Sequence, residues 1–122
     1  MSLAHTGFEL VTKRTRKREF LDEMNLVIPW SELLSLIAPY APAGKTGRPP
    51  FATEVMLRIH LLQQFFGHSD PAMEEALHDI PLYQEFAHLD AGMSRLPDES
   101  TILRFRHMLE AHGLGQQILA TV

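Results

Sequence analysis

The sequence predicts an all-α fold, a compact bundle of five to seven short helices with a helix-turn-helix-like portion. Apolar residues recur at helical spacing in several separate segments, and helix-starting and helix-ending residues flank most of them. No stretch alternates between apolar and polar residues for long enough to predict a strand. With 122 residues, of which 45% are hydrophobic and 21% charged, the chain has the size and composition of one globular domain.

The first part of the chain is expected to be a flexible basic arm over residues 1–14, followed by a single helical domain over 15–122. The first helix begins near Thr15 and continues through RKREFLDEMN. Pro29 interrupts the pattern, and Ser31 is expected to cap the next helix in SELLSLIAPY. The apolar contacts of these two helices are expected to be Phe20, Leu21, Met24, Trp30, Leu33, Leu34 and Ile37.

A linker rich in proline and glycine is expected over about 39–51, and the strongest helix follows over 52–66, closed by Gly67. Apolar residues occupy nearly all faces of this helix, which predicts that it is the most buried one, with Ile59 and Leu62 near its centre. Five polar residues interrupt the apolar pattern, namely Glu54, Arg58, His60, Gln63 and Gln64, the last expected nearer solvent.

Three short helices, over roughly 70–80, 82–89 and 99–112, are compatible with a helix-turn-helix arrangement, although many helical bundles share this pattern. Pro81 begins the middle segment. Asp98 is expected to cap the third helix and Gly113 to end it. The final segment, LGQQILATV, also reads as helical. The residues expected to face inward in the second and third helices are Leu82, Tyr83, Phe86, Leu89, Ile102, Phe105, Met108, Leu109 and His112.

The helix over 99–112 has a polar side that predicts either a DNA-reading surface or an ordinary solvated one. Its hydroxyl, guanidinium and imidazole groups are types that contact phosphates and base edges. These groups belong to Ser100, Thr101, Arg104 and His107. Arg106 lies close to the apolar stripe, and two roles are open for it: a contact to DNA like that of its neighbours, or a structural ion pair, for which Glu110 is at the right spacing.

A basic cluster, KRTRKR, stands out from an otherwise acidic chain of net charge −4. Residues 1–50 hold seven basic and five acidic side chains (+2), whereas 51–122 hold four and ten (−6). Basic charge at the start of a helix opposes the helix dipole, so phosphate is a natural partner. The alternative is a solvated helix start. The cluster comprises Lys13, Arg14, Arg16, Lys17 and Arg18.

No pattern of catalytic, metal-binding or cofactor-binding residues stands out, so neither an enzyme nor a cofactor is expected. The absence of cysteine excludes disulfides and thiol chemistry, and no two histidines form an HExxH motif. The acidic pairs Glu74–Glu75 and Asp98–Glu99 both fall in first helical turns, where the dipole favours carboxylates. No apolar stretch resembles a signal peptide or a membrane span, so a cytoplasmic location is expected.

Several motifs in order resemble one family. They are TRKREFLDEM, PW at 29–30, GRPP at 47–50, MLRIH at 56–60, SDPAMEEAL at 69–77 and PDESTILRFRHMLE at 97–110. Together they resemble the N-terminal domain of bacterial insertion-sequence transposases of the InsH-like type. The family implies DNA cutting and joining by three carboxylates and two divalent metal ions on an RNase H-like DDE domain. That domain is expected to be absent from this chain, which ends before the first of those carboxylates.

The resemblance implies that the chain recognises the terminal inverted repeats of its element in double-stranded DNA. The five basic residues of the KRTRKR cluster would hold phosphates, Lys45 and Arg48 would follow the backbone or a minor groove, and the polar side of 99–112 would face the major groove. The alternative is a protein–protein module that dimerises the transposase or poisons its assembly. Met56, Phe65 and Phe66 would suit that role, with a homodimer or full-length transposase as partner.

Overall fold

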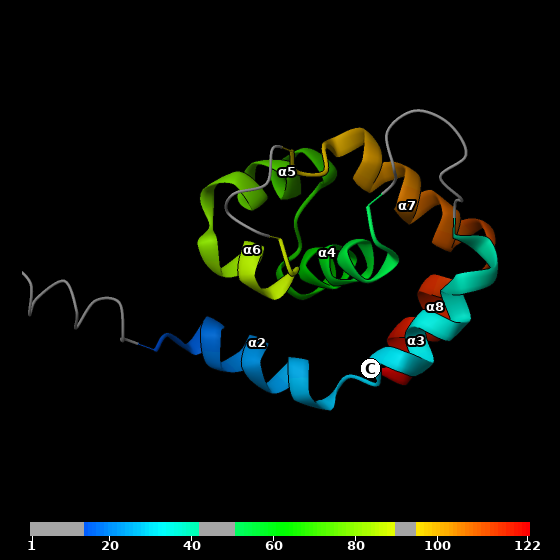
Figure 1. The fold of residues 1–122 in the computed structure, drawn as a ribbon, viewed down its shortest axis with the longest axis horizontal. Coiled ribbons are helices and arrows are strands. Elements are labelled where there is room, and N and C mark those ends of the chain that lie inside the picture. Colours follow the sequence, from blue (N-terminus) through cyan, green and yellow to red (C-terminus); the bar gives the residue numbers. More distant parts are fainter. Residues whose placement is uncertain (1–13, 42–50, 90–94) are drawn as a thin grey trace, which may run out of the picture.

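The computed structural model describes residues 14–41, 51–89 and 95–122 (Figure 1). Within these ranges the chain forms seven α-helices, one short 3-10 helix and no strand, so the predicted all-α class is confirmed. The elements are α2 (Arg16–Val27), α3 (Trp30–Ile37), η1 (Ala38–Tyr40), α4 (Thr53–Phe66), α5 (Asp70–Asp79), α6 (Pro81–Phe86), α7 (Glu99–Ala111) and α8 (Leu114–Thr121).

Helix α4 is the centre of the bundle, as its sequence predicts. It packs against α3, α5 and α7, and the other helices surround it (Figure 1). Ile59 and Leu62 are fully buried, whereas Gln64 is exposed, so the predicted phase of this helix is confirmed. Gly67 ends α4 in the left-handed conformation, with φ of 68°, which glycine adopts without steric cost. The bundle is therefore organised around one almost completely buried helix.

Helices α2 and α3 begin with different kinds of N-cap. Thr15 caps α2, and its side chain accepts a hydrogen bond from the Arg18 backbone N–H at 3.1 Å. Helix α3 begins two residues earlier than expected, at Trp30, so the prediction that Ser31 caps it is wrong. Pro29 is the N-cap and makes no side-chain cap bond. The Trp30 indole N–H donates to the Asn25 backbone carbonyl at 2.9 Å, which anchors this start.

Helices α5 and α6 are joined by Ile80 alone. Ser69 caps α5 and accepts from the Ala72 N–H at 3.2 Å. Helix α6 stops at Phe86 rather than at 89, because His88 adopts a left-handed φ of 61° and the Leu89 N–H turns back to the Gln84 carbonyl. Leu89 still faces inward, as predicted.

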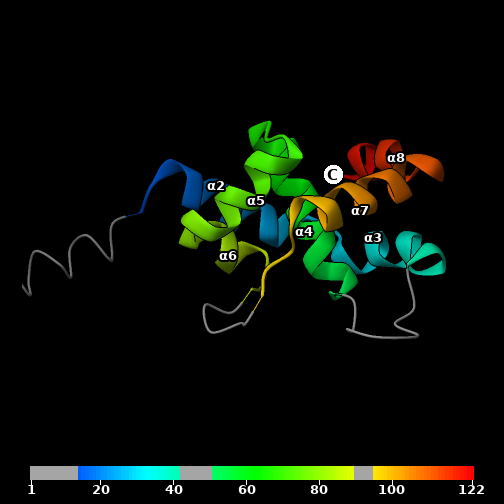
Figure 2. The same cartoon turned by 90° about the horizontal axis from the view of Figure 1, so that it is seen from above.

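Helices α7 and α8 close the far side of the bundle, where α8 also packs against α3 (Figure 2). Asp98 caps α7 as predicted, accepting from the Thr101 N–H at 2.9 Å, and Gly113 separates the two helices at φ of 65°. His112 does not join the apolar stripe. It is exposed and stacks on Tyr40 of η1, with 4.0 Å between ring centroids. Helix α7 ends at Ala111, one residue before His112, and the imidazole of His112 stacks on the exposed ring of Tyr40 instead of entering the core.

Candidate nucleic-acid interface

The outer face of α7 carries the four polar residues that the sequence singled out. Arg104, His107 and Ser100 are exposed, and Thr101 is half-buried. The Arg104 guanidinium donates to the Thr101 hydroxyl at 3.4 Å, a long bond within the same helix. At 3.6 residues per turn, Ala111 extends this face, which holds no carboxylate along its middle turns. Met108, at the border of the face, packs against the core, as predicted. The donors on this face can therefore contact an anion, because no carboxylate beside them repels it.

The N-terminus of α7 is occupied by two carboxylates. Asp98 accepts from the Thr101 N–H, and this backbone bond holds the pKa of Asp98 below its usual range. Glu74 of α5 accepts from the Glu99 N–H at 2.6 Å. The Glu99 and Thr101 amides, which would otherwise attract a phosphate, are therefore bonded to the protein's own acids. This arrangement favours anion contact by side chains of α7 over contact by its N-terminal amides.

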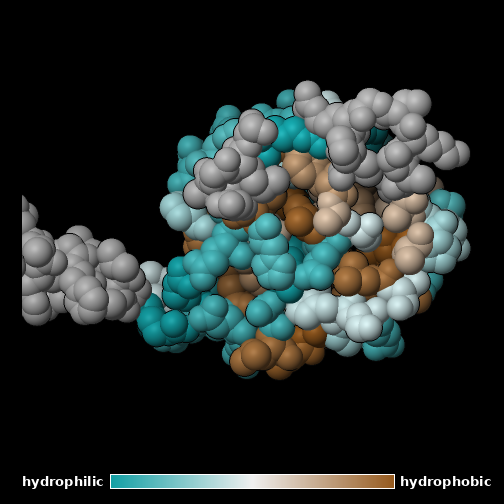
Figure 3. All heavy atoms as spheres, viewed as in Figure 1, coloured by the Kyte–Doolittle hydropathy of each residue, from teal (hydrophilic) through white to brown (hydrophobic). Residues whose placement is uncertain are grey.

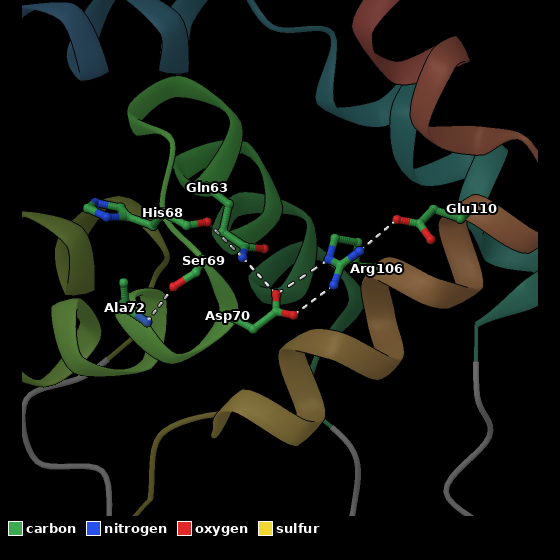
Figure 4. Close-up of polar contacts among 7 residues, drawn as sticks. All are labelled: Gln63, His68, Ser69, Asp70, Ala72, Arg106 and Glu110. Atoms are coloured by element: carbon green, nitrogen blue, oxygen red, sulfur yellow. Dashed lines mark hydrogen bonds and ion pairs between the residues drawn. The ribbon is translucent and has the colours of Figure 1, made fainter.

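A charged network behind α7 fixes the rotation of the helix about its axis (Figure 4). Arg106 donates to Asp70 of α5 through Nη2 at 2.8 Å and Nε at 3.4 Å, and through Nη1 to Glu110 at 2.8 Å. The predicted Arg106–Glu110 pair is thus present, with Asp70 as a second partner. The bond from Arg106 lowers the pKa of Asp70, and a bond from Gln63 of α4 at 2.9 Å adds to this effect. Arg106 is therefore directed into the bundle, and Arg104 outwards.

The basic cluster at the start of α2 is already largely engaged with the protein. Arg14 forms an ion pair with Asp22 one helical turn beyond the cluster. Lys17 lies over two aromatic rings, with Nζ 4.7 Å from the centre of Phe66 and 5.4 Å from that of Tyr83. Arg18 makes a two-point contact with Glu85 of α6. The contacts of Lys17 and Arg18 attach α2 to the bundle, whereas the Arg14–Asp22 pair is local to α2.

Arg16 differs from its neighbours in the cluster. Its side chain is exposed on the outer face of α2, and no ion pair joins it to another residue in the parts of the chain that the structure describes. It is thus the basic residue of α2 best placed to meet an anion from solvent. Lys13, Lys45 and Arg48, the other predicted phosphate contacts, lie outside the described residues.

The two candidate surfaces are not contiguous. Helix α2 lies against α6 at one edge of the bundle, and α7 lies across α4 and α5 on the other side (Figures 1 and 2). The structure therefore brings Ser100, Thr101, Arg104 and His107 together on one face of α7. Arg14, Arg16, Lys17 and Arg18 lie near one another at the start of α2 but point in different directions. The two groups do not form a single basic stripe.

Two of the carboxylates that engage the basic residues, Glu85 and Asp70, have no sequence signal. Glu85 is 67 residues from Arg18, and Asp70 is 36 residues from Arg106. The spacing of Glu110 from Arg106 is readable from a helical pattern, whereas these long-range partners depend on the packing of α2 on α6 and of α5 on α7.

A comparison with protein families decides the identity of the domain. Residues 9–108 match the family model described as Transposase domain (DUF772). The chain belongs to this transposase-domain family. The match covers α2 through most of α7, so it includes both candidate surfaces of the transposase domain. No solved structure matched the chain.

The described residues of this transposase domain include no group of three or more His, Cys, Asp or Glu side chains that could hold a metal ion. The carboxylates discussed above are caps or ion-pair partners of nearby helices. Among the helices that the structure describes, none is long and apolar enough to span a bilayer.

Proposed function

We propose that this transposase domain binds double-stranded DNA and recognises the terminal inverted repeats of an InsH-like, DDE-class insertion element. The outer face of α7 is the observation that carries the proposal. It presents Arg104 and His107 to solvent with two hydroxyl groups nearby and has no carboxylate along its middle turns. Arginine is the commonest reader of guanine in the major groove, because its fork matches two acceptors on the base edge.

In this proposal Arg104 and His107 contact base edges, while Ser100 and Thr101 donate to phosphates or bases. Recognition helices commonly use their N-terminal residues for base contacts. The acids at the start of α7, Asp98 and Glu74, favour contact by its middle turns instead. The ion pair of Arg106 with Asp70 would hold the reading face in a fixed orientation.

The basic start of α2 would contribute phosphate contacts that carry no sequence information. Arg16 is the first candidate, with Arg14, Lys17, Arg18 and Lys13 around it, and Lys45 and Arg48 of the linker would follow the backbone or a minor groove. Because α2 and α7 lie on different sides of the bundle, the two sets would touch different stretches of one bent duplex or of two duplexes.

In the same proposal the chain itself catalyses neither cleavage nor joining of DNA. The catalytic carboxylates of the full transposase would belong to a separate DDE domain, and the helical domain described above would deliver the element ends to that DDE domain. Its place of action would be the bacterial cytoplasm, at the nucleoid.

A helix-turn-helix formed by α5, α6 and α7 would require the long connection over 87–98 in place of the usual turn of three or four residues.

A second candidate function is favoured by one observation. Leu26 and Val27 at the end of α2 are 84% and 63% exposed, and an apolar patch covers this edge of the molecule (Figure 3). Exposed apolar patches commonly mark protein contacts. A second copy of the chain or the full-length transposase would be the partner. Met56, one of the residues expected to serve this role, is instead buried in the core.

The test of the proposed function is a gel shift with the terminal inverted repeat of the element and a scrambled duplex of equal length. Preferential binding of the repeat supports sequence recognition. Equal binding of both duplexes contradicts recognition but keeps DNA binding, and no binding at low salt contradicts both. A Leu26→Ser, Val27→Ser double variant that loses self-association in sedimentation but retains DNA binding would support the second function alongside the first.

A further inference from the structure

Arg18 and Glu85 join α2 to α6 through two parallel hydrogen bonds. The Arg18 Nη1 donates to Oε1 of Glu85 at 3.0 Å, and Nη2 donates to Oε2 at 2.9 Å. This two-point geometry is also the one in which a guanidinium binds two oxygens of a phosphate. The carboxylate of Glu85 therefore occupies the same donors that a DNA phosphate would use.

The pair lies at the surface, where a solvent anion can compete with it. The side chain of Arg18 is 31% exposed and that of Glu85 is 61% exposed. Ion pairs with this exposure contribute little to stability, because water and salt screen them. The bond to Arg18 lowers the pKa of Glu85, and the bond to Glu85 raises the pKa of Arg18, so both groups stay charged at neutral pH.

Other contacts keep α2 in place when this pair opens. Leu21 is buried against the core, and Ile28 follows directly after the helix in the same core. Lys17 remains over the rings of Phe66 and Tyr83. Arg18 can therefore exchange the Glu85 carboxylate for another anion while α2 stays packed on the bundle.

We infer that Glu85 is an internal competitor of DNA, which occupies the guanidinium of Arg18 until a backbone phosphate displaces it. The inference rests on the proposed DNA binding and adds a regulatory element to that site. Glu85 holds back one phosphate contact, which weakens the sequence-independent part of binding and leaves base reading by α7 unchanged.

The test compares the full chain with its Glu85→Gln variant in a salt titration, with a short labelled duplex of scrambled sequence as the probe. Glutamine keeps the shape of the side chain and removes the charge. We expect scrambled DNA to bind about two- to fivefold more tightly, because no surface ion pair must be broken. The slope of log affinity against log salt concentration should steepen, by at most about 0.9, because in the unmodified chain the displaced Glu85 carboxylate attracts a cation that offsets the one released from the phosphate.

Two controls separate displacement from general charge effects. Glu23 is an exposed acid on α2, the helix that carries Arg18, and no ion pair joins it to another described residue. Its Glu23→Gln variant removes the same charge and should leave the salt slope unchanged. In an Arg18→Gln background the Glu85→Gln change should lose its effect, since the two residues act as one pair.

Unchanged or weaker binding by Glu85→Gln would overturn the inference, and weaker binding would show that the pair holds α2 in its binding position. An equal gain in the Arg18→Gln background, or an equally steep slope for Glu23→Gln, would assign the effect to general repulsion and also overturn it. If the unmodified chain fails to bind DNA while Glu85→Gln binds, the competition is complete and the inference stands. If neither binds, the proposed function and the inference fail together.

Discussion

His60 lies in the interior of the domain, on α4, where burial lowers the pKa of its imidazole to about 4 and the positive charge of Arg106 adds to this effect. Its Nδ1 atom is fully buried and has no hydrogen-bond partner among the described residues. The folded domain therefore holds this residue neutral. The unfolded chain has no such constraint, and histidine there titrates near pH 6.5.

This difference predicts that the domain loses stability as the pH falls below about 6.5. The unfolded chain then binds a proton that the folded chain excludes, so unfolding is favoured until the pH reaches the folded-state pKa of about 4. Between pH 7 and pH 5 we expect the free energy of unfolding to fall by roughly 2 kcal/mol, measured by urea denaturation. The lowered pKa values of Asp70, Glu85 and Asp98 act at lower pH, because carboxylates of the unfolded chain titrate near 4.

The control for this prediction is a pair of histidine variants. His60→Leu should flatten the dependence between pH 7 and pH 5, whereas His78→Leu, on the exposed side of α5, should retain it. A free energy of unfolding that is constant over this range in the unmodified domain, or a dependence that survives in His60→Leu, would contradict the account of the buried imidazole.

His88 occupies a backbone conformation that favours glycine. Its φ of 61° lies in the left-handed region, where it ends α6 and allows the Leu89 N–H to reach the Gln84 carbonyl at 2.8 Å. His88→Gly should relieve the strain and stabilise the domain by about 0.5–1 kcal/mol relative to His88→Ala, which retains it.

Thermal unfolding of the two variants measures the difference. Both lack the contact of the imidazole with Glu54 at 3.3 Å, so the comparison isolates the backbone. Equal stability of the two variants, or greater stability of the alanine variant, would show that the backbone at this position is not strained.

At the scale of the element, α4 offers the sharpest contrast between neighbouring positions. Leu62 is fully buried, and Gln64, two residues later, is exposed. Leu62→Ala should cost about 2–5 kcal/mol, because it removes buried methyl groups and leaves a cavity. Gln64→Ala should change stability by less than about 0.5 kcal/mol. Chemical denaturation of both variants checks the assignment, and a Gln64→Ala cost equal to that of Leu62→Ala would contradict the packing of α4.

The helices were largely predictable because their signals are local. Asp98 and Gly113 bracket α7, and Gly67 ends α4, each by a capping interaction within a few residues. The prediction is wrong where the local sequence allows two different helix starts. Ser31 could cap a helix, but Pro29 and the anchored ring of Trp30 start α3 earlier.

The interior position of three polar residues of α4 could not be predicted in the same way. Arg58, His60 and Gln63 interrupt the apolar pattern of α4. Polar residues in such a pattern ordinarily indicate a solvent-exposed edge of the helix. Arg58 is nevertheless 4% exposed, because Glu54, Asn25 and the Phe86 carbonyl accept its hydrogen bonds and the ring of Trp30 lies 3.9 Å from it. Those partners come from four helices, α2, α3, α4 and α6, and only the assembled fold brings them together.

At the scale of the whole molecule, the domain separates its candidate DNA contacts into two surfaces. The sequence predicts which residues are basic but not which of them are neutralised. Arg104 and Arg106 are two positions apart on α7, yet one faces solvent and the other is bonded to Asp70 and Glu110. Likewise Arg16 is exposed on α2, whereas Arg18 is engaged by Glu85. Long-range packing assigns these roles.

The most direct test of the central claim, that α7 reads DNA bases while α2 contacts the backbone, is one salt titration on inverted-repeat and scrambled duplexes. Arg104→Ala should cost about 1–3 kcal/mol on the repeat and relax specificity at one position. Arg16→Ala should weaken both duplexes alike and reduce the salt slope by about one. If Arg104→Ala instead weakens both duplexes equally, residue 104 contacts phosphate and the reading role is wrong. If it changes neither, the outer face of α7 does not bind DNA.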